Sequence, residues 1–122
     1  MASEKMIVDT LAKMENEING FIAASVVDTE SGMTLGVMST RPDFDLAAAS
    51  AYNSEIVKQK LKTIKALNLK SNLEDMLLTL SDQIHLIKLL SPTSFIYLAA
   101  DKGQTNLAIV RSTVSKYAVE LT

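Results

Sequence analysis

The first third of the chain combines one helical pattern with two strand-like patterns. Four apolar residues recur at the spacing of a single helix face: they are Ile7, Leu11, Met14 and Ile18. Ser3 can cap this helix at its start, and Gly20 can end it. Residues 21–28 and 33–39 have the composition of strands, with Gly32 between them where a hairpin requires a positive φ. The pattern therefore predicts a helix followed by a β-hairpin.

The rest of the chain predicts a long helix, three strands and a last helix. Pro42 blocks further strand pairing, and Asp45 can cap a helix from Leu46 to about Ala66. Three β-forming segments then follow with only short turns between them; they span residues 73–80, 83–90 and 94–100. Gly103 can take the positive φ of a tight turn into the last helix. The apolar face of that helix comprises Leu107, Val110, Val114, Tyr117 and Leu121.

Several predicted strands are apolar on both faces, which means that helices must cover both faces of their sheet. In the strand 21–28, strict alternation puts Phe21, Ala23 and Val27 on one face and Ile22, Ala24 and Val26 on the other. The short connections make sequential strands antiparallel. The predicted order α-β-β-α-β-β-β-α therefore gives an α/β (α+β) fold, in which a five-stranded antiparallel sheet is sandwiched between one long helix and two terminal helices.

Length and composition describe one ordinary globular domain spanning residues 1–122. Apolar residues make up 48% of the chain and charged residues 21%, so the composition is that of a folded and not a disordered chain. The absence of cysteine excludes disulfides, thiolate nucleophiles and thiolate metal sites. No apolar run has the length of a membrane span, and the start lacks the order of a signal peptide. We expect a cytoplasmic protein with no membrane insertion.

Residues that carry chemistry are sparse, and most have a structural explanation. His85 is the only histidine, so it has no second histidine with which to form a metal site, and we expect it to be packed or hydrogen-bonded in the core. No base is identifiable that would activate a serine. The carboxylates of Glu74 and Asp75 are explained as edge-strand charges, and Gly36 by a bulge or a close backbone approach. We therefore expect no catalytic residue, no metal and no cofactor, and we do not expect an enzyme.

Three segments of the chain resemble the roadblock/dynein light chain family. They are residues 20–28 with the Gly32 hairpin, the alanine-rich start of the long helix at residues 47–51, and the junction before the last helix. At that junction the family usually has Asn-Leu-Ala-x-x-Arg, and this chain has Asn106, Leu107, Ala108 and Arg111. The order of elements is also that of the family, so the resemblance implies a roadblock-like (profilin-like) fold. For Arg111 it favours a role in packing and hydrogen bonding.

The resemblance implies a function in binding and not in catalysis. It implies a non-catalytic homodimer that binds a small Ras-like GTPase and modulates its GTP hydrolysis or localisation, as bacterial members of the family do. Two alternatives stay open: an adaptor or light-chain-like scaffold without effect on GTP hydrolysis, and a small-molecule sensor domain. The rate of GTP hydrolysis by a candidate GTPase, with and without this protein, separates regulation from scaffolding.

The long helix has a surface suited to a second helix. Its predicted core stripe comprises Leu46, Ala49, Ile56, Val57, Leu61 and Ile64, with the polar Asn53 and Lys60 inside the stripe. On another face, Ala47, Ala48 and Ala51 leave a small-residue surface on which a symmetric partner helix can pack closely. Asn53 can then fix the register of the two helices. High helix propensity alone also explains the alanines.

The predicted edge strand and the basic part of the long helix supply the other candidate contacts. In the family the third strand pairs with the same strand of a second copy, which puts Met76 and Leu78 at the seam. Residues 46–70 carry five lysines against Glu55. The candidate partner-binding residues among them are Lys58, Lys62 and Lys65. A solvated helix face is the alternative, and no aromatic residues interleave these lysines for base stacking, so we expect no nucleic-acid partner.

Overall fold

The elements of the structure follow the predicted order. The computed structural model describes residues 2–122. Its elements are α1 (Glu4–Glu17), β1 (Phe21–Asp28), β2 (Thr34–Ser39), α2 (Leu46–Ala66), β3 (Asp75–Thr79), β4 (Gln83–Ser91), β5 (Ser94–Asp101), α3 (Leu107–Ala118) and the short 3-10 helix η1 (Val119–Leu121). The strands form one antiparallel sheet in the order β2-β1-β5-β4-β3. The predicted element order and the five-stranded antiparallel sheet are confirmed.

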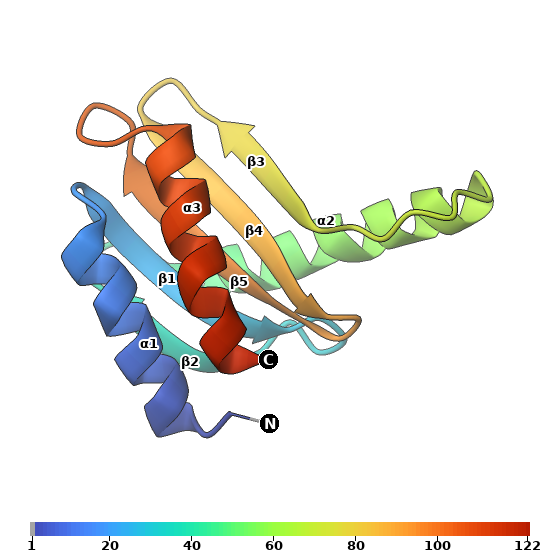
Figure 1. The fold of residues 1–122 in the computed structure, drawn as a ribbon, viewed down its shortest axis with the longest axis horizontal. Coiled ribbons are helices and arrows are strands. Elements are labelled where there is room, and N and C mark those ends of the chain that lie inside the picture. The colour runs from blue at the N-terminus through green and yellow to red at the C-terminus, as the bar shows by residue number, and fades with distance from the viewer. Residues whose placement is uncertain (1) are drawn as a thin grey trace.

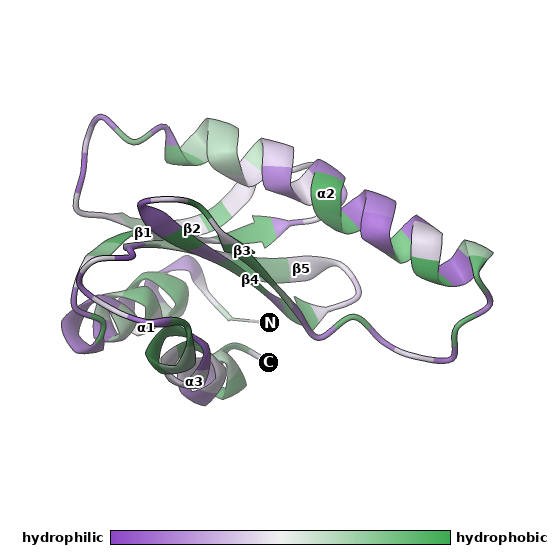
Figure 2. Ribbon diagram, turned by 90° about the horizontal axis from the view of Figure 1, so that it is seen from above, coloured by the Kyte–Doolittle hydropathy of each residue, from purple (hydrophilic) through white to green (hydrophobic). Residues whose placement is uncertain are grey.

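The sheet lies between two helical layers, as the apolar faces of its strands require (Figure 1). Figure 2 shows α2 on one face of the sheet and α1 with α3 on the other. The central strands β1 and β5 are buried from Phe21 to Val27 and from Phe95 to Ala100. The core beneath α1 and α3 includes Leu11, Met14, Ile96, Leu98 and Val114. The core beneath α2 includes Val27, Val57, Ile87, Phe95 and Tyr97.

The alternation of β1 is interrupted at its start. Phe21 pairs with Ala100 while Ala23 pairs with Ala99, so the register with β5 shifts around Ile22. Phe21 therefore joins the core beneath α1 and α3, whereas Ile22 and Ala23 both join the core beneath α2. The faces predicted for Phe21 and Ile22 in the strand are wrong, because a β-bulge turns two consecutive side chains to one face.

The buried face of α2 is more polar than a simple core stripe. Ser50 and Asn53 are buried, whereas Ile56 is 41% exposed. The Ser50 hydroxyl donates to the carbonyl oxygen of Leu46, and the Asn53 side-chain amide donates to that of Ala49, each at 2.7 Å. These groups are buried at little cost because the backbone of the helix satisfies them. The core position predicted for Ile56 is therefore wrong.

Local signals for helix starts and turns are correct at most positions. The side chains of Ser3 and Asp45 each accept a hydrogen bond from the backbone N–H three residues later, as predicted for helix caps. Gly32 has a φ of 74°, as the hairpin requires. Gly103 does not have a positive φ, so that prediction is wrong. Its N–H donates instead to the Asp101 carboxylate at 2.8 Å, which forms the turn without a left-handed residue.

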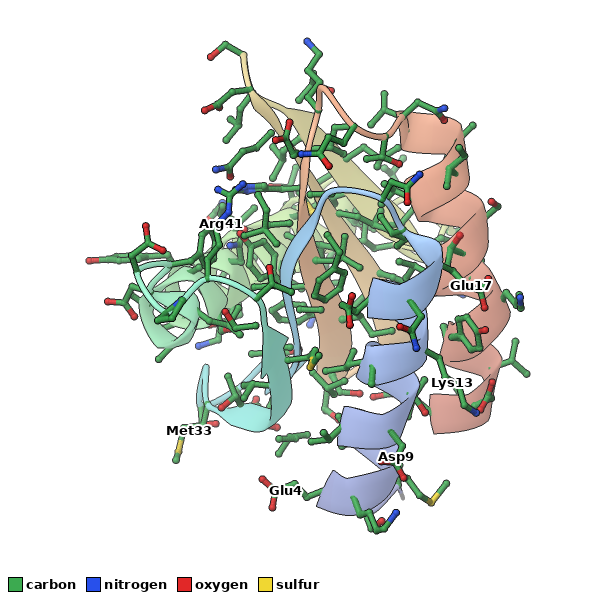
Figure 3. The ribbon with its side chains drawn as sticks, turned by 90° about the vertical axis from the view of Figure 1, so that its left-hand side faces the viewer. Glu4, Asp9, Lys13, Glu17, Met33 and Arg41 are labelled. Atoms are coloured by element: carbon green, nitrogen blue, oxygen red, sulfur yellow. The ribbon has the colours of Figure 1, made fainter. Side chains whose placement is uncertain are left out.

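Polar contacts join α1 to the C-terminal helices along an exposed seam, where Figure 3 shows Lys13 and Glu17 on α1. The Lys13 ammonium lies 3.1 Å from the Glu120 carboxylate, and the Lys116 ammonium donates to Glu17 at 3.0 Å. The Tyr117 hydroxyl also donates to Glu17. Exposed ion pairs contribute little to stability. The apolar core beneath the seam therefore supplies most of the energy that holds the two helices to the sheet.

α1 packs directly on Gly36 of β2. A Cβ atom added at this glycine would overlap the Ile7 Cγ2 atom and would lie 2.9 Å from the Ile7 Cβ atom, so no larger residue fits without a shift of the helix. The pairing of β2 with β1 also changes register between Thr34 and Gly36, which leaves Leu35 as an extra residue in a β-bulge. Both features expected of this glycine, a bulge and a close approach, are therefore present.

We expect Gly36→Ala to lower the free energy of unfolding by about 1–3 kcal/mol, because the added methyl group overpacks the contact with Ile7. Urea unfolding followed by circular dichroism gives the value. Gly103→Ala is the matched control, since the nearest atom to a Cβ there is the Asp101 Oδ1 atom at 3.3 Å. Adding Ile7→Ala to Gly36→Ala relieves the closest contact, so the double variant should lose less than the sum of the two single losses. Fully additive losses would contradict the close approach.

Candidate partner-binding site

β3 is a regular and unpaired edge of the sheet. It pairs with β4 without interruption over its whole length, and within residues 2–122 no strand lies on its other side. The opposite edge, β2, is interrupted by the bulge at Leu35. Met76 and Leu78 are half-buried and contact the core on the α2 face of β3. A free edge without a bulge can add a further strand.

A groove of about 550 Å³ lies between β3 and the neighbouring flank of α2. Its lining residues are Glu55, Ile56, Gln59, Lys60, Thr63 and Met76. Tyr52 lies one turn before Ile56 on the same side of the helix and is 74% exposed. The second half of α2 extends past the edge of the sheet (Figures 1 and 2). We call β3, together with this groove and Tyr52, the β3 surface.

The structure places the predicted interface residues in different settings. Met76 lines the groove, and Leu78 lies two residues further along the same face of β3. Asn53 is only 8% exposed and is bonded within its own helix, so we do not assign it to an interface. Ala51 lies beside the β1–β2 hairpin, where a Cβ atom added at Gly32 would be 3.3 Å from the Ala51 Cα atom.

Packing within the chain explains part of the alanine surface. A small residue is needed at Ala51 because the hairpin approaches there, and Ala47, one turn earlier, shares that flank. Ala48 is half-buried. The residues of α2 on the β3 surface instead recur along another flank; they are Tyr52, Glu55, Ile56, Gln59, Lys60 and Thr63. The sequence signal for them is the apolar pair Tyr52 and Ile56, one turn apart at the margin of the core stripe.

The segment from Asn106 to Arg111 joins α3 to the edge strand. The Asn106 side chain caps α3 by accepting from the Ile109 N–H at 3.0 Å. The Arg111 guanidinium donates to both oxygens of the Asp75 carboxylate, at 2.7 and 2.8 Å. This bidentate pair is a strong geometry for an ion pair. Asp75 is thus paired with Arg111. The interpretation of Asp75 as an edge-strand charge, drawn from the sequence, did not predict this partner.

Leu107 and Ala108 line a second groove, which lies between the start of α3 and the end of β3. Its volume is about 440 Å³, and Thr79 and Ile84 also contribute to it. Leu107 is 38% exposed, so its predicted position on the buried face of α3 is wrong. The buried face of the helix begins one turn later, at Val110.

Hydrogen bonding from Arg111 lowers the pKa of the Asp75 carboxyl group, and the same contact raises the pKa of Arg111. The side chain of Asp75 is 12% exposed, whereas that of Arg111 is 55% exposed. The carboxylate is therefore shielded from water on the α3 side of β3 and stays ionised at neutral pH. The ion pair links β3 to α3, which covers the face of the sheet opposite to α2.

The outer sides of α2 are polar and basic. Lys62 and Lys65 are exposed and form no ion pair within residues 2–122. Lys58 pairs with Glu55 at 3.4 Å. The groove includes Lys60 but none of these three lysines, which lie on other sides of the helix.

No helix among residues 2–122 is both long enough and apolar enough to cross a membrane.

His85 forms hydrogen bonds at both ring nitrogens. Its Nε2 atom lies 2.7 Å from the Gln83 side-chain oxygen, and its Nδ1 atom lies 3.3 Å from the Tyr97 hydroxyl. Burial lowers the pKa of His85 and raises the pKa of Tyr97 to about 12. Among residues 2–122, no group of His, Asp and Glu side chains is arranged to hold a metal ion. The hydrogen-bonded position expected for His85 is confirmed.

A five-stranded antiparallel sheet with a long helix on one face and two terminal helices on the other defines the roadblock/LC7 fold, which this chain has. A solved structure with this fold is Myxococcus xanthus MglB, with a TM-score of 0.87 and 14% identity, over 100% of this chain and 90% of that chain. The gliding protein MglB from Thermus thermophilus has a TM-score of 0.82 and 13% identity, over 97% and 87% of the two chains.

A roadblock/LC7 domain from Streptomyces avermitilis is also similar, with a TM-score of 0.80 and 8% identity over 99% of this chain and 95% of that domain. At such low identities the likeness shows a shared fold. Compared by sequence, the chain matches no protein-family model and no curated protein. The roadblock-type fold expected from the sequence is therefore confirmed by structure, where sequence comparison finds no match.

We expect Asp75→Asn to lower the free energy of unfolding at pH 7 by up to about 1 kcal/mol, the upper range for ion pairs near a surface. The pKa of Asp75 is lowered in the folded state, so its contribution is complete above its ordinary value of 3.8 and is lost as the pH falls through the folded-state value. Urea unfolding at a series of pH values should show the difference from wild type narrowing below about pH 4. Asp9→Asn is the control. Asp9 pairs with Lys5, and its side chain is 58% exposed, so its replacement should change the free energy of unfolding little. If the free energies of unfolding of wild type and Asp75→Asn differed by the same amount at acidic pH, the stabilising role of the Asp75 charge would be contradicted.

Proposed function

We propose that the chain is a non-catalytic homodimeric regulatory or scaffold protein, which binds a small Ras-like GTPase and modulates its GTP hydrolysis or localisation. The observation that carries this proposal is the β3 surface, where a regular free edge lies beside a groove and an exposed helix flank. The likeness of the fold to MglB and the resemblance of the sequence to the roadblock family support it. One neighbour is described as MglB with a tetrameric arrangement, so a protein of this fold associates with itself.

In the proposed dimer, β3 of one copy pairs antiparallel with β3 of the other, and the two sheets become one. Met76 and Leu78 then lie at the seam. The second half of each α2, which extends past its own sheet, lies over the sheet of the partner. Because Ala51 is next to its own hairpin, we place the contact between the long helices at Tyr52 and Ile56 and not at the alanines.

The pair of long helices would present their basic outer sides to the GTPase. Lys58, Lys62 and Lys65 lie there, and charges at the rim of an interface accelerate association more than they strengthen the complex. Arg111 is held by Asp75, so it is not free to enter the active site of a GTPase as an arginine finger. We therefore favour an effect on the conformation or location of the GTPase over the insertion of Arg111.

The rate of GTP hydrolysis by a candidate Ras-like GTPase, with and without the protein, is the direct test of regulation. A changed rate supports regulation. An unchanged rate with measurable binding supports the adaptor alternative, for which the same β3 surface suffices. Binding of a small molecule without any binding to the GTPase would favour the sensor alternative and contradict the proposal.

We expect the wild-type chain to sediment as a dimer at tens of micromolar, and Ile56→Asp to weaken dimerisation by at least about tenfold, because the charge would be buried at the centre of the contact. Analytical ultracentrifugation over a concentration series measures both. Met33→Asp is the matched control: Met33 is 69% exposed on the hairpin, and Figure 3 shows it pointing into solvent. A wild-type monomer, or equal effects of the two substitutions, would contradict the proposed interface.

The double reversal Lys58→Glu and Lys62→Glu should slow association with the GTPase by about tenfold at low salt and reduce its salt dependence, since steering by the basic face is lost. Stopped-flow or surface-based kinetics at several salt concentrations measure this. Lys5→Glu with Lys102→Glu is the control, because it changes the net charge by the same amount at exposed residues on α1 and on the β5–α3 loop. Unchanged association in the first variant would show that these helix lysines are only a solvated face.

A further inference from the structure

The far end of α2 is an ordered tip with two exposed leucines. The helix ends at Ala66, and the chain turns back through Leu67, Asn68 and Leu69. The backbone N–H groups of these three residues donate to carbonyl oxygens in the last turn of the helix at 3.0 to 3.1 Å, and Asn68 has a left-handed φ of 55°. Leu67 is 63% exposed and Leu69 is 51% exposed. Figure 1 shows this turn as the part of the chain that extends furthest from the sheet.

The tip has a strong positive charge in a chain that is otherwise acidic. The net charge of the whole chain is −2, yet no acidic residue occurs between positions 56 and 73. The exposed lysines of this segment are Lys60, Lys62, Lys65 and Lys70. Within residues 2–122 none of them forms an ion pair. At helical spacing, Lys62 and Lys65 lie on one side of α2 and Lys60 lies on the opposite side, so the positive charge flanks the leucines on two sides instead of forming one stripe.

We propose that this tip is a peripheral docking site for an anionic lipid surface. Two leucines at a convex apex can enter the region between lipid head groups and acyl chains, and lysines on opposite sides of the helix can contact the negative surface beside them. An acidic patch on a folded protein would meet only one side of such a tip, and a protein pocket for the leucines would have to enclose a helix end. The cations on two opposite sides of the helix therefore match a fluid surface better.

The two leucines and Lys70 of the tip lie outside the proposed contacts with a second copy and with a GTPase, whereas Lys60 lines the groove and Lys62 and Lys65 also belong to the basic side proposed for the GTPase. The groove of the β3 surface ends at Thr63, before the turn. Lipid docking also does not require a dimer, although two tips on one dimer would bind the same surface with higher avidity. This peripheral contact differs from the expectation, drawn from the sequence, of no membrane insertion, since the leucines would enter the head-group region without any segment crossing the bilayer.

The test uses the full chain with vesicles of phosphatidylcholine, with and without phosphatidylserine, in a sedimentation assay. We expect binding only to the vesicles that contain phosphatidylserine, with an affinity that falls as salt is added. Leu67→Ser with Leu69→Ser should reduce binding by at least about tenfold, because the apolar contribution is removed. Met33→Ser with Leu80→Ser is the matched control, since both residues are exposed elsewhere, at 69% and 43%, and should leave binding unchanged. Circular dichroism checks that all variants are folded.

A second pair of variants tests the charge. Lys65→Gln with Lys70→Gln should weaken binding to the anionic vesicles and make it less sensitive to salt, while Lys5→Gln with Lys102→Gln should not. No preference of the wild type for phosphatidylserine would overturn the proposal, as would vesicle binding that the leucine variant retains. A leucine variant that loses dimerisation or GTPase binding, with vesicle binding intact, would assign the tip to a protein interface instead.

Discussion

The burial of β1 and β5 on both faces is the constraint on which the rest of the structure depends. These strands lie in the middle of the sheet, and β5 has no exposed residue from Phe95 to Ala100. Burial of apolar surface is the main favourable contribution to folding, and here it requires a helical layer on each face. α2 provides one layer by packing on buried residues of β1, β4 and β5. The flank of its second half beside β3 is left free.

Polar residues on the buried side of α2 make this arrangement possible. The Ser50 hydroxyl lies 2.8 Å from the Ser25 hydroxyl of β1, so two small side chains bring the helix close to the strand. Because these buried groups are hydrogen-bonded, the close packing costs little. The larger apolar residues Tyr52 and Ile56 are turned away from the central strands. A helix that buries serine and exposes isoleucine is poorly adapted to a monomer and well adapted to a second contact.

Features that depend on neighbours in the chain could be predicted from the sequence, and features that depend on distant segments could not. The cap at Asp45 and the order of the elements follow from local patterns. The exchange of faces between Phe21 and Ile22 results from the register with β5. The pair of Asp75 and Arg111 joins residues 36 positions apart. At the candidate site, the edge strand was predictable, but the groove depends on the angle at which α2 crosses the sheet, which no local pattern encodes.

The two edges of the sheet differ in a way that limits how copies of the chain can associate. At β2, the bulge at Leu35 and the packing of Ile7 on Gly36 disturb the edge. At β3 the pairing is regular, and the charge of Asp75 is directed to Arg111 on α3 instead of along the edge. Pairing of β3 with β3 joins identical surfaces and closes after two copies, whereas pairing of β3 with β2 would continue into a fibre. The difference between the edges therefore favours a closed dimer, which covers the groove and presents the basic sides of the long helices to other molecules.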